Sequence, residues 1–198
     1  MTDLTIQKGS TFSRVLRWES APFVYAPITA ITKAAPAVIT AAGHGLVSGW
    51  RAAVISAGGM RQINAKQIPP RANEMHKVTY VSATQVNMNG VNSADYTAYT
   101  SGGFLVSYTP VSLAGFSARM KIRETVESAT ALVSLVSPAD IVLDDTNHTI
   151  TITIDAVATA AYTFATGVYD LELVSGAGTP VVTRLLEGNV RVVNEVTR

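Results

Sequence analysis

Three histidines, His44, His76 and His148, are the side chains best suited to acid–base or metal chemistry near neutral pH. They lie far apart in the sequence and do not form the His-x-x-x-His spacing of a helical zinc site. His44 stands between two glycines, where an imidazole that hydrogen-bonds the backbone of a turn is the expected role. The chain contains no cysteine, so it offers no thiolate nucleophile and no cysteine metal site.

Two groups of acidic residues are further candidates for chemistry. The segment DDTNHT at 144–149 suggests calcium by composition, but it lacks the glycine and the downstream glutamate of a twelve-residue calcium loop. We expect an acidic turn before a strand. Asp170 and Glu172 could mimic the acid and base of a glycosidase, yet strand alternation places both on one outward face, which favours a solvated surface. With no nucleophile elbow, phosphate loop or dinucleotide fingerprint either, we predict no catalytic, cofactor-binding or metal-binding residue and no enzyme activity.

Basic residues in the middle of the chain are candidates for binding. Arg61, Lys66, Arg71 and Lys77 lie close together in the sequence, with His76 beside them. Such cations could hold a phosphate backbone or an acidic glycan, but aromatic residues for base stacking are missing among them. We therefore expect an interface with an acidic protein surface, including that of an adjacent copy, and no nucleic acid.

Aromatic residues provide a second candidate surface. Trp50, Tyr96 and Tyr99 would form a sugar-stacking platform if the protein were an adhesin. The alternative is that Trp50 is buried in the core of a small barrel.

Composition limits the class of protein. Of 198 residues, 47% are apolar and only 15% are charged, which is typical of a folded chain with one domain or two small ones. The formal net charge of +1 predicts no strong attraction to nucleic acid or to an anionic membrane. Without a signal-like start or an apolar run of membrane-spanning length, we expect a soluble protein made in a reducing cytosol.

Period-two alternation predicts an almost wholly β fold. The segments FSARMKIR at 116–123 and HTITITID at 148–155 alternate apolar and polar residues, as a half-buried strand does, and GVYDLELV at 167–174 repeats the pattern. The segment at 181–196 is interpreted as a hairpin whose turn lies at Glu187, Gly188 and Asn189. The segments at 128–136 and 138–145 fit either a strand or a short helix.

The middle of the chain differs from the rest in amino-acid composition and net charge. Residues 28–108 are rich in Gly, Ala and Asn and carry a net charge of +4, whereas the rest of the chain carries −3. The pattern at Tyr25–Thr29 recurs at Tyr108–Ser112, at the two ends of this middle segment. We therefore predict a discontinuous β-sandwich formed by residues 1–27 and 109–198, interrupted by a small β-barrel at 28–108. Tyr25 and Tyr108 would run side by side, with Pro27 and Pro110 ending the pairing.

The outer segments resemble a family of bacteriophage tail and baseplate proteins. The features are Lys-Gly-x-x-Phe at 8–12, a glycine before the ARMKIR strand, YDLEL at 169–173, LLEGNV at 185–190 and the terminal EVTR. Their order is similar to the N-terminal Ig-like β-sandwich with which upper-baseplate proteins attach to the tail.

The middle segment resembles another known module. Through GHGLVSGW at 43–50, GGMRQIN at 58–64 and SADYTAYTSGG at 93–103, it is similar to the first catalytic cysteine half-domain (FCCH) of ubiquitin-activating enzymes. That half-domain does not supply the cysteine, so the resemblance implies a fold and no ligase chemistry.

Together the resemblances imply a structural component of a bacteriophage virion. The expected place is the tail, baseplate or tail-fibre attachment, reached after synthesis in the bacterial cytoplasm. The expected partners are other tail, baseplate or fibre proteins and further copies of the chain in a three- or six-fold ring, without cofactor or membrane insertion. The alternative is a receptor- or polysaccharide-binding adhesin module.

Overall fold

The structure is a computed structural model that describes residues 2–176 and 178–195. It confirms the predicted all-β fold, since strands and their turns account for nearly all of the described chain. Two compact units divide the chain: unit 1 runs to Trp18 and resumes at Val111, and unit 2 is Glu19–Pro110. No helix among the described residues is long and apolar enough to cross a membrane.

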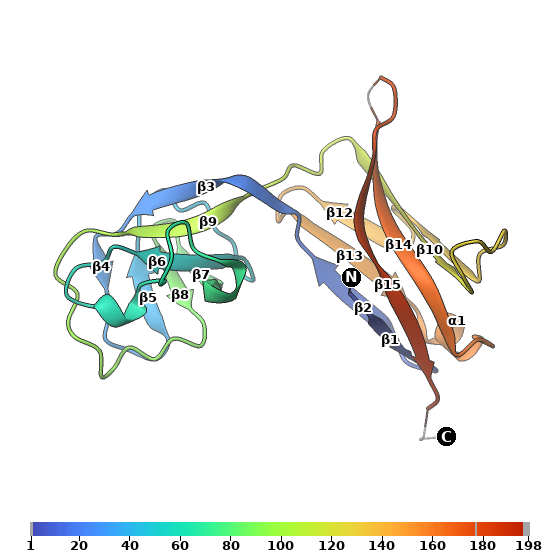
Figure 1. Ribbon diagram of the computed structural model, residues 1–198, viewed down its shortest axis with the longest axis horizontal. Helices are drawn as coiled ribbons and strands as arrows, with labels where there is room; N and C mark the ends of the chain where they lie inside the picture. The colour runs from blue at the N-terminus through green and yellow to red at the C-terminus, as the bar shows by residue number, and fades with distance from the viewer. Residues whose placement is uncertain (1, 177, 196–198) are drawn as a thin grey trace. The chain divides into compact units, whose positions relative to one another are not determined.

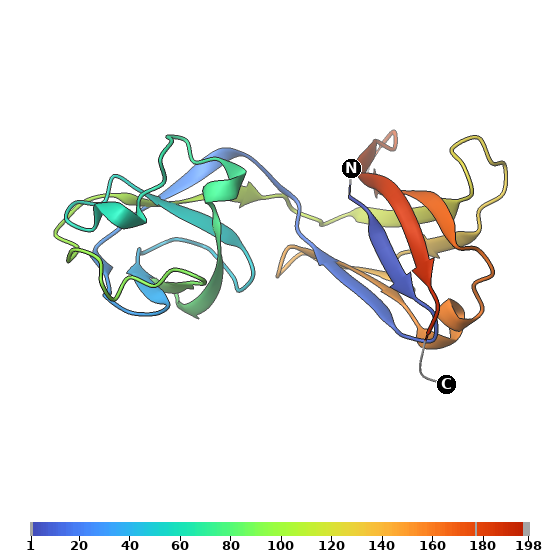
Figure 2. The same ribbon diagram turned by 60° about the horizontal axis from the view of Figure 1, so that its bottom comes forward.

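Unit 1 consists of two sheets that enclose one core (Figures 1 and 2). The five-stranded sheet has the order β1 (Leu4–Gln7), β15 (Val182–Val193), β14 (Thr166–Ser175), β10 (Phe116–Arg123) and β11 (Val133–Val136). The three-stranded sheet has the order β12 (Ile141–Asp144), β13 (Thr149–Ile154) and β2 (Phe12–Leu16). Strand β1 runs parallel to β15, and the other pairs are antiparallel.

The core of unit 1 follows directly from the alternation in its strands. Met120 and Ile122 of β10 and Leu171 of β14 face Ile150 and Ile152 of β13 in one apolar cluster. The residues between them point outward, because successive side chains of a strand lie on opposite faces. The segments left open by the sequence are the strands β11 and β12. A short helix that the sequence did not predict, α1 (Ala156–Ala160), begins where the Asp155 side chain accepts a hydrogen bond from the Ala158 N–H.

The predicted C-terminal hairpin is wrong. Strand β15 continues through Glu187, Gly188 and Asn189 without a turn, and it forms a long antiparallel pair with β14 instead. Gly188 serves close packing: a Cβ there would collide with the backbone oxygen of Thr2, whose N–H donates to Glu187 O at 3.0 Å. The last residues of the EVTR motif, 196–198, lie outside the described residues.

Unit 2 is one curled seven-stranded sheet with its own core. Its order is β3 (Glu19–Pro27), β9 (Phe104–Pro110), β6 (Arg51–Ile55), β7 (His76–Ser82), β8 (Gln85–Met88), β5 (Ala37–Thr40) and β4 (Ala30–Ile31). Two short 3₁₀ helices, η1 (Arg61–Ile63) and η2 (Ala72–Glu74), lie between β6 and β7. The core gathers around Trp50, which is 1% exposed.

The two ends of this sheet are joined by the chain itself. Strands β3 and β4 are the edges, and the backbone passes from one to the other at Ile28 and Thr29. There the Ile28 N–H donates to Gly103 O at 3.0 Å and the Thr29 N–H donates to Thr40 O at 2.9 Å. The sheet still has two edge strands that do not pair with each other as a ladder. The strand pairing by itself therefore does not make unit 2 the closed barrel that we expect from the sequence.

The first boundary between the units lies at Trp18–Glu19, not at residue 27. Strand β3 belongs to unit 2 because it pairs with β9 along its length. Their antiparallel register sets Tyr108 opposite Phe23 and Tyr25 opposite Val106, so the two tyrosines are not direct neighbours. With these bounds unit 2 has six basic and three acidic residues, which gives a net charge of +3. The rest of the chain has nine basic and eleven acidic residues, which gives a net charge of −2.

Candidate functional site

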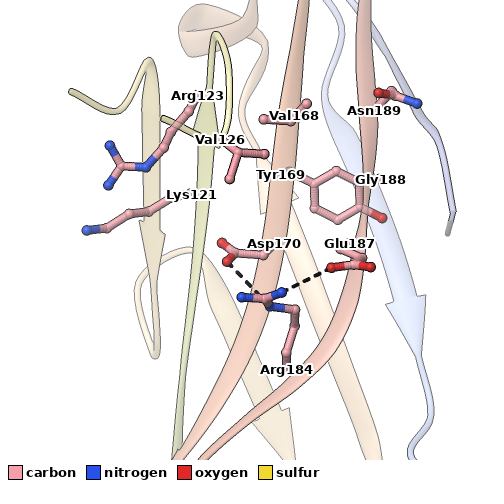
Figure 3. Close-up of a pocket in the computed structure, with 10 residues that line it drawn as sticks. All are labelled: Lys121, Arg123, Val126, Val168, Tyr169, Asp170, Arg184, Glu187, Gly188 and Asn189. Carbon is pink, nitrogen blue, oxygen red and sulfur yellow. Dashed lines mark hydrogen bonds and ion pairs between the residues drawn. The ribbon is translucent and has the colours of Figure 1, made fainter. Parts of the chain in front are cut away.

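The outer face of the five-stranded sheet carries a shallow pocket of about 250 Å³ over β10, β14 and β15 (Figure 3). The register brings three of its outward-pointing residues into one row: Lys121 of β10 lies opposite Asp170 of β14, which lies opposite Glu187 of β15. Val126, in the loop after β10, adds an exposed apolar side chain to the rim. The pocket is therefore a charged hollow on an open sheet face.

Most charges on this face are already engaged with one another. Arg184 lies between two carboxylates, with Nε 3.7 Å from Asp170 Oδ2 and Nη1 3.1 Å from Glu187 Oε2 (Figure 3). In the next row, Arg119 Nη2 lies 2.8 Å from Glu172 Oε2. Asp170 and Glu172, the pair that a glycosidase could use, thus lie on the outward face with an arginine each. These exposed ion pairs add little stability, and the surface they form suits a polar contact with a partner.

Two groups in the pocket are structural. Arg123 Nη1 donates to the carbonyl oxygens of Ser128, at 2.5 Å, and Ala129, at 2.8 Å, which holds the loop after β10. The hydroxyl of Tyr169 donates to Thr2 O at 2.6 Å, and burial raises the pKa of this phenol. Tyr169 is thereby a neutral strut between β14 and the start of the chain.

The outer face of the three-stranded sheet is charged at one end, where Asp144 of β12 lies opposite Thr149 of β13, and the other two rows of its strand residues carry no charge. Its central row is Val142 of β12, Thr151 of β13 and Val15 of β2, and the next row pairs Thr153 with Ser13. Val142 and Val15 are 52% and 50% exposed. These two rows present β-branched and hydroxyl side chains without a charge. We call these five residues the uncharged face.

The predicted basic interface is only partly brought together. Lys66 and Arg71 meet at one carboxylate, because their backbone N–H groups donate to Glu74 at 2.6 and 2.9 Å. These hydrogen bonds lower the pKa of Glu74. Lys77 lies on β7, opposite Arg51 in the register, and Arg61 begins η1. All four predicted cations are exposed, but no contact among their side chains is recorded within the described residues.

The predicted sugar platform of Trp50, Tyr96 and Tyr99 does not form. Trp50 is a core residue, so its ring has no face available for stacking. Tyr96 and Tyr99 are half-buried against the same core. The Tyr99 hydroxyl donates to Ile28 O at 2.9 Å, with Gly102 O at 3.0 Å as a second acceptor, which fixes the ring in place.

An aromatic surface that the sequence reasoning missed lies on β3 and β9. Phe23 lies 4.5 Å from Tyr108 and 6.5 Å from Tyr25 between ring centroids, and Tyr25 lies 6.1 Å from Phe104. We call these four residues the aromatic cluster. Tyr25 and Tyr108 both belong to the repeated sequence pattern, and this repeat was the signal that could have revealed the cluster. The pairing of β3 with β9 brings their rings to one face of the sheet.

The remaining candidates for chemistry are turn residues. The His44 Nδ1 accepts a hydrogen bond from the Leu46 N–H at 3.0 Å, and its Nε2 lies 3.1 Å from Ser82 O, as expected for an imidazole that bonds the backbone. In the acidic turn, Asp145 accepts from Leu113 N and Ser112 Oγ, and Asp144 accepts from Asn147. Within residues 2–176 and 178–195, no group of His, Asp and Glu side chains has a metal-binding arrangement.

No family model matches the sequence, and no curated protein matches it.

Proposed function

We propose that this protein is a structural component of a bacteriophage virion, in the tail, baseplate or tail-fibre attachment, and that it assembles through protein–protein interfaces. The observation that carries the proposal is the uncharged face of unit 1. A sheet face that stays in water is normally charged, as the five-stranded sheet is, whereas a face that meets another protein is depleted of charge at its centre.

The size of the uncharged face fits the centre of an interface. Its two rows lie about 7 Å apart on strands about 4.8 Å apart, so the uncharged face covers roughly 10 by 10 Å, well below the ~800 Å² per partner of a stable complex. The surrounding polar residues would complete the contact as its rim. Val142 and Val15 would be the apolar residues that lose the most exposed area there.

Charge supplies a second contribution to assembly. Unit 2 has a net charge of +3, and the remainder of the chain has −2, so Arg61, Lys66, Arg71 and Lys77 of one copy favour an acidic neighbour. Attraction of this kind orients the partners and speeds association more than it adds affinity. It fits both a ring of identical copies and contact with other tail, baseplate or fibre proteins.

The sequence resemblance supports this choice of assembly. The Lys-Gly-x-x-Phe, ARMKIR, YDLEL and LLEGNV segments resemble, in their order, the tail-attachment sandwich of upper-baseplate proteins, and all lie in unit 1. The FCCH-like segments lie in unit 2. Unit 1 would then be the attachment part, and unit 2 an additional contact surface.

The proposal is tested on purified virions of the phage that encodes the chain. Quantitative mass spectrometry of gradient-purified particles is expected to find the chain in a fixed ratio to the major tail protein. Loss of the chain from particles on purification, or its presence only in the soluble lysate, would contradict a structural role.

A further inference from the structure

A short loop of unit 2 holds an exposed apolar side chain in a fixed place. Ile68 is 64% exposed in the loop 66–71, which lies between η1 and η2. Glu74 closes the base of this loop, because its carboxylate accepts the backbone N–H groups of Lys66 and Arg71 at 2.6 and 2.9 Å. We call residues 66–71 the Ile68 loop. Its tip is ordered before a partner binds, which lowers the entropy cost of a contact there.

The Ile68 loop is also basic. Lys66 and Arg71 stand at its two ends and are exposed, and with Glu74 at the base they leave a net charge of +1. One exposed apolar residue is ordinary on a protein surface. An ordered isoleucine between two cations is more specific, because it suits a partner surface that is apolar at its centre and acidic around it.

The uncharged face of unit 1 has an acidic surround. Asp144 lies two residues after Val142 on β12, so strand alternation puts both on the outer side of the sheet. The charged residues at the ends of the three strands, or directly beyond them, are four carboxylates and one cation: Asp140, Asp144, Asp145, Asp155 and Arg17. Their net charge of −3 is opposite in sign to that of the Ile68 loop.

A ring of identical copies requires two different surfaces on each copy. In a closed ring of three or more copies the contact is heterologous, so the uncharged face of one copy meets another part of the next copy. That part must be apolar at its centre, basic at its edge and small enough for a face of roughly 10 by 10 Å. The Ile68 loop meets all three conditions.

We propose that the Ile68 loop of one copy docks on the uncharged face of the next copy. Ile68 packs against Val15 and Val142, while Lys66 and Arg71 face the carboxylates around that face. The apolar contact supplies affinity, and the charges orient the two copies. This inference rests on the proposed function and deepens it, because it names the surface of the neighbour that covers the uncharged face.

Sedimentation velocity of the full-length chain tests the role of the loop. We expect Ile68→Asp to weaken association about tenfold or more, because a carboxylate then enters the centre of an acidic surround. The double variant Lys66→Glu, Arg71→Glu should weaken association as well, and added salt should weaken that of the parent chain. Val81→Asp is the matched control, since Val81 is 46% exposed on β7 of the same unit and lies outside the loop. Thermal unfolding checks that each variant remains folded.

A mixture of two variants identifies the partner surface. Ile68→Asp keeps the uncharged face intact, and the double variant Val15→Lys, Val142→Lys keeps the Ile68 loop intact. Neither variant should assemble alone. Their equimolar mixture should form a dimer with one copy of each, because one intact loop and one intact face remain to meet. If the uncharged face met its own kind instead, Ile68→Asp would assemble without mixing.

The possible failures are distinguishable. If the parent chain assembles and Ile68→Asp assembles equally well, or if the mixture stays monomeric, docking of the loop is overturned while assembly through the uncharged face stands. A parent chain that stays monomeric contradicts the assembly of identical copies, and this docking with it. An intact Ile68→Asp oligomer that is missing from purified virions would assign the loop to another tail protein, which also overturns a contact between copies.

Discussion

The ring of Tyr108 packs on the ring of Phe23, with centroids 4.5 Å apart, and the two residues are direct partners in the antiparallel pair of β3 and β9. This contact joins the first and last strands of unit 2. Next to it, the Val111 N–H donates to Trp18 O at 3.0 Å in unit 1. The chain thus leaves unit 1 and returns to it at adjacent positions, as an inserted unit requires.

Removal of unit 2 should leave unit 1 folded. In this variant Trp18 is joined to Val111 through Asn-Gly, which suits a tight turn between adjacent antiparallel ends. We expect a cooperative thermal transition and the dispersed amide spectrum of a β protein, because the core of Met120, Ile122, Leu171, Ile150 and Ile152 contains no residue of unit 2. A molten or insoluble product would show that the two units do not fold separately.

Ile152→Ala should destabilise unit 1 strongly. Ile152 lies 1% exposed between the two sheets, and truncation of such a residue costs about 2–5 kcal/mol of unfolding free energy. Val136→Ala on β11 is the control, because its side chain is 50% exposed and lies outside the uncharged face, so that free energy should change by less than about 0.5 kcal/mol. Urea unfolding of both variants measures the difference, and similar losses would mean that the two faces are assigned wrongly.

Gly188→Ala tests why β15 carries a glycine. An alanine in an ordinary strand interior is favoured over glycine by about 0.5–1 kcal/mol, but here the added Cβ collides with the backbone of Thr2. We expect a loss of about 1–3 kcal/mol and faster hydrogen exchange in β1. Glu187→Ala, one residue away and exposed, should have neither effect. A more stable Gly188→Ala variant would contradict the close packing of Gly188 on Thr2.

The acidic turn of unit 1 should make stability depend on pH. Hydrogen bonds from the Leu113 N–H and the Ser112 hydroxyl lower the pKa of Asp145 below its ordinary value of 3.8, and those from Asn147 lower that of Asp144. A carboxyl whose folded pKa is depressed stabilises the fold above its unfolded pKa, and this contribution is lost as the pH falls through the folded value.

The unfolding free energy should therefore decrease from about pH 4 downward, and less steeply in Asp145→Asn. Urea midpoints measured between about pH 2 and 6 give the slope for each protein. Parallel curves for the parent chain and Asp145→Asn would indicate that Asp145 does not contribute.

The sequence was sufficient for features that depend on alternation. It identified the strands β10, β13 and β14 and their buried faces, because one residue in two must face the core. It also located a change in residue composition and in net charge near both ends of unit 2. The two glycines that flank His44 were likewise enough to predict that its imidazole hydrogen-bonds the backbone of a turn.

Features that depend on distant partners were not predictable in this way. Gly188 has the residue type of a turn, and only the approach of Thr2 shows that it serves close packing. The first boundary was set at residue 27 because the repeated pattern includes Pro27, whereas the pairing with β9 begins at Glu19. The aromatic cluster needs the register of β3 on β9, which sequence spacing does not give.

Sedimentation velocity of the purified chain tests the central claim, that the uncharged face is an assembly interface, most directly. The account predicts a closed oligomer whose mass is a multiple of 20.9 kDa, and a folded monomer with a cooperative thermal transition for the double variant Val15→Lys, Val142→Lys. Lys121→Glu, on the charged face, should leave the oligomer intact. A parent chain that stays monomeric at all concentrations, or a double variant that assembles as the parent does, would contradict the account.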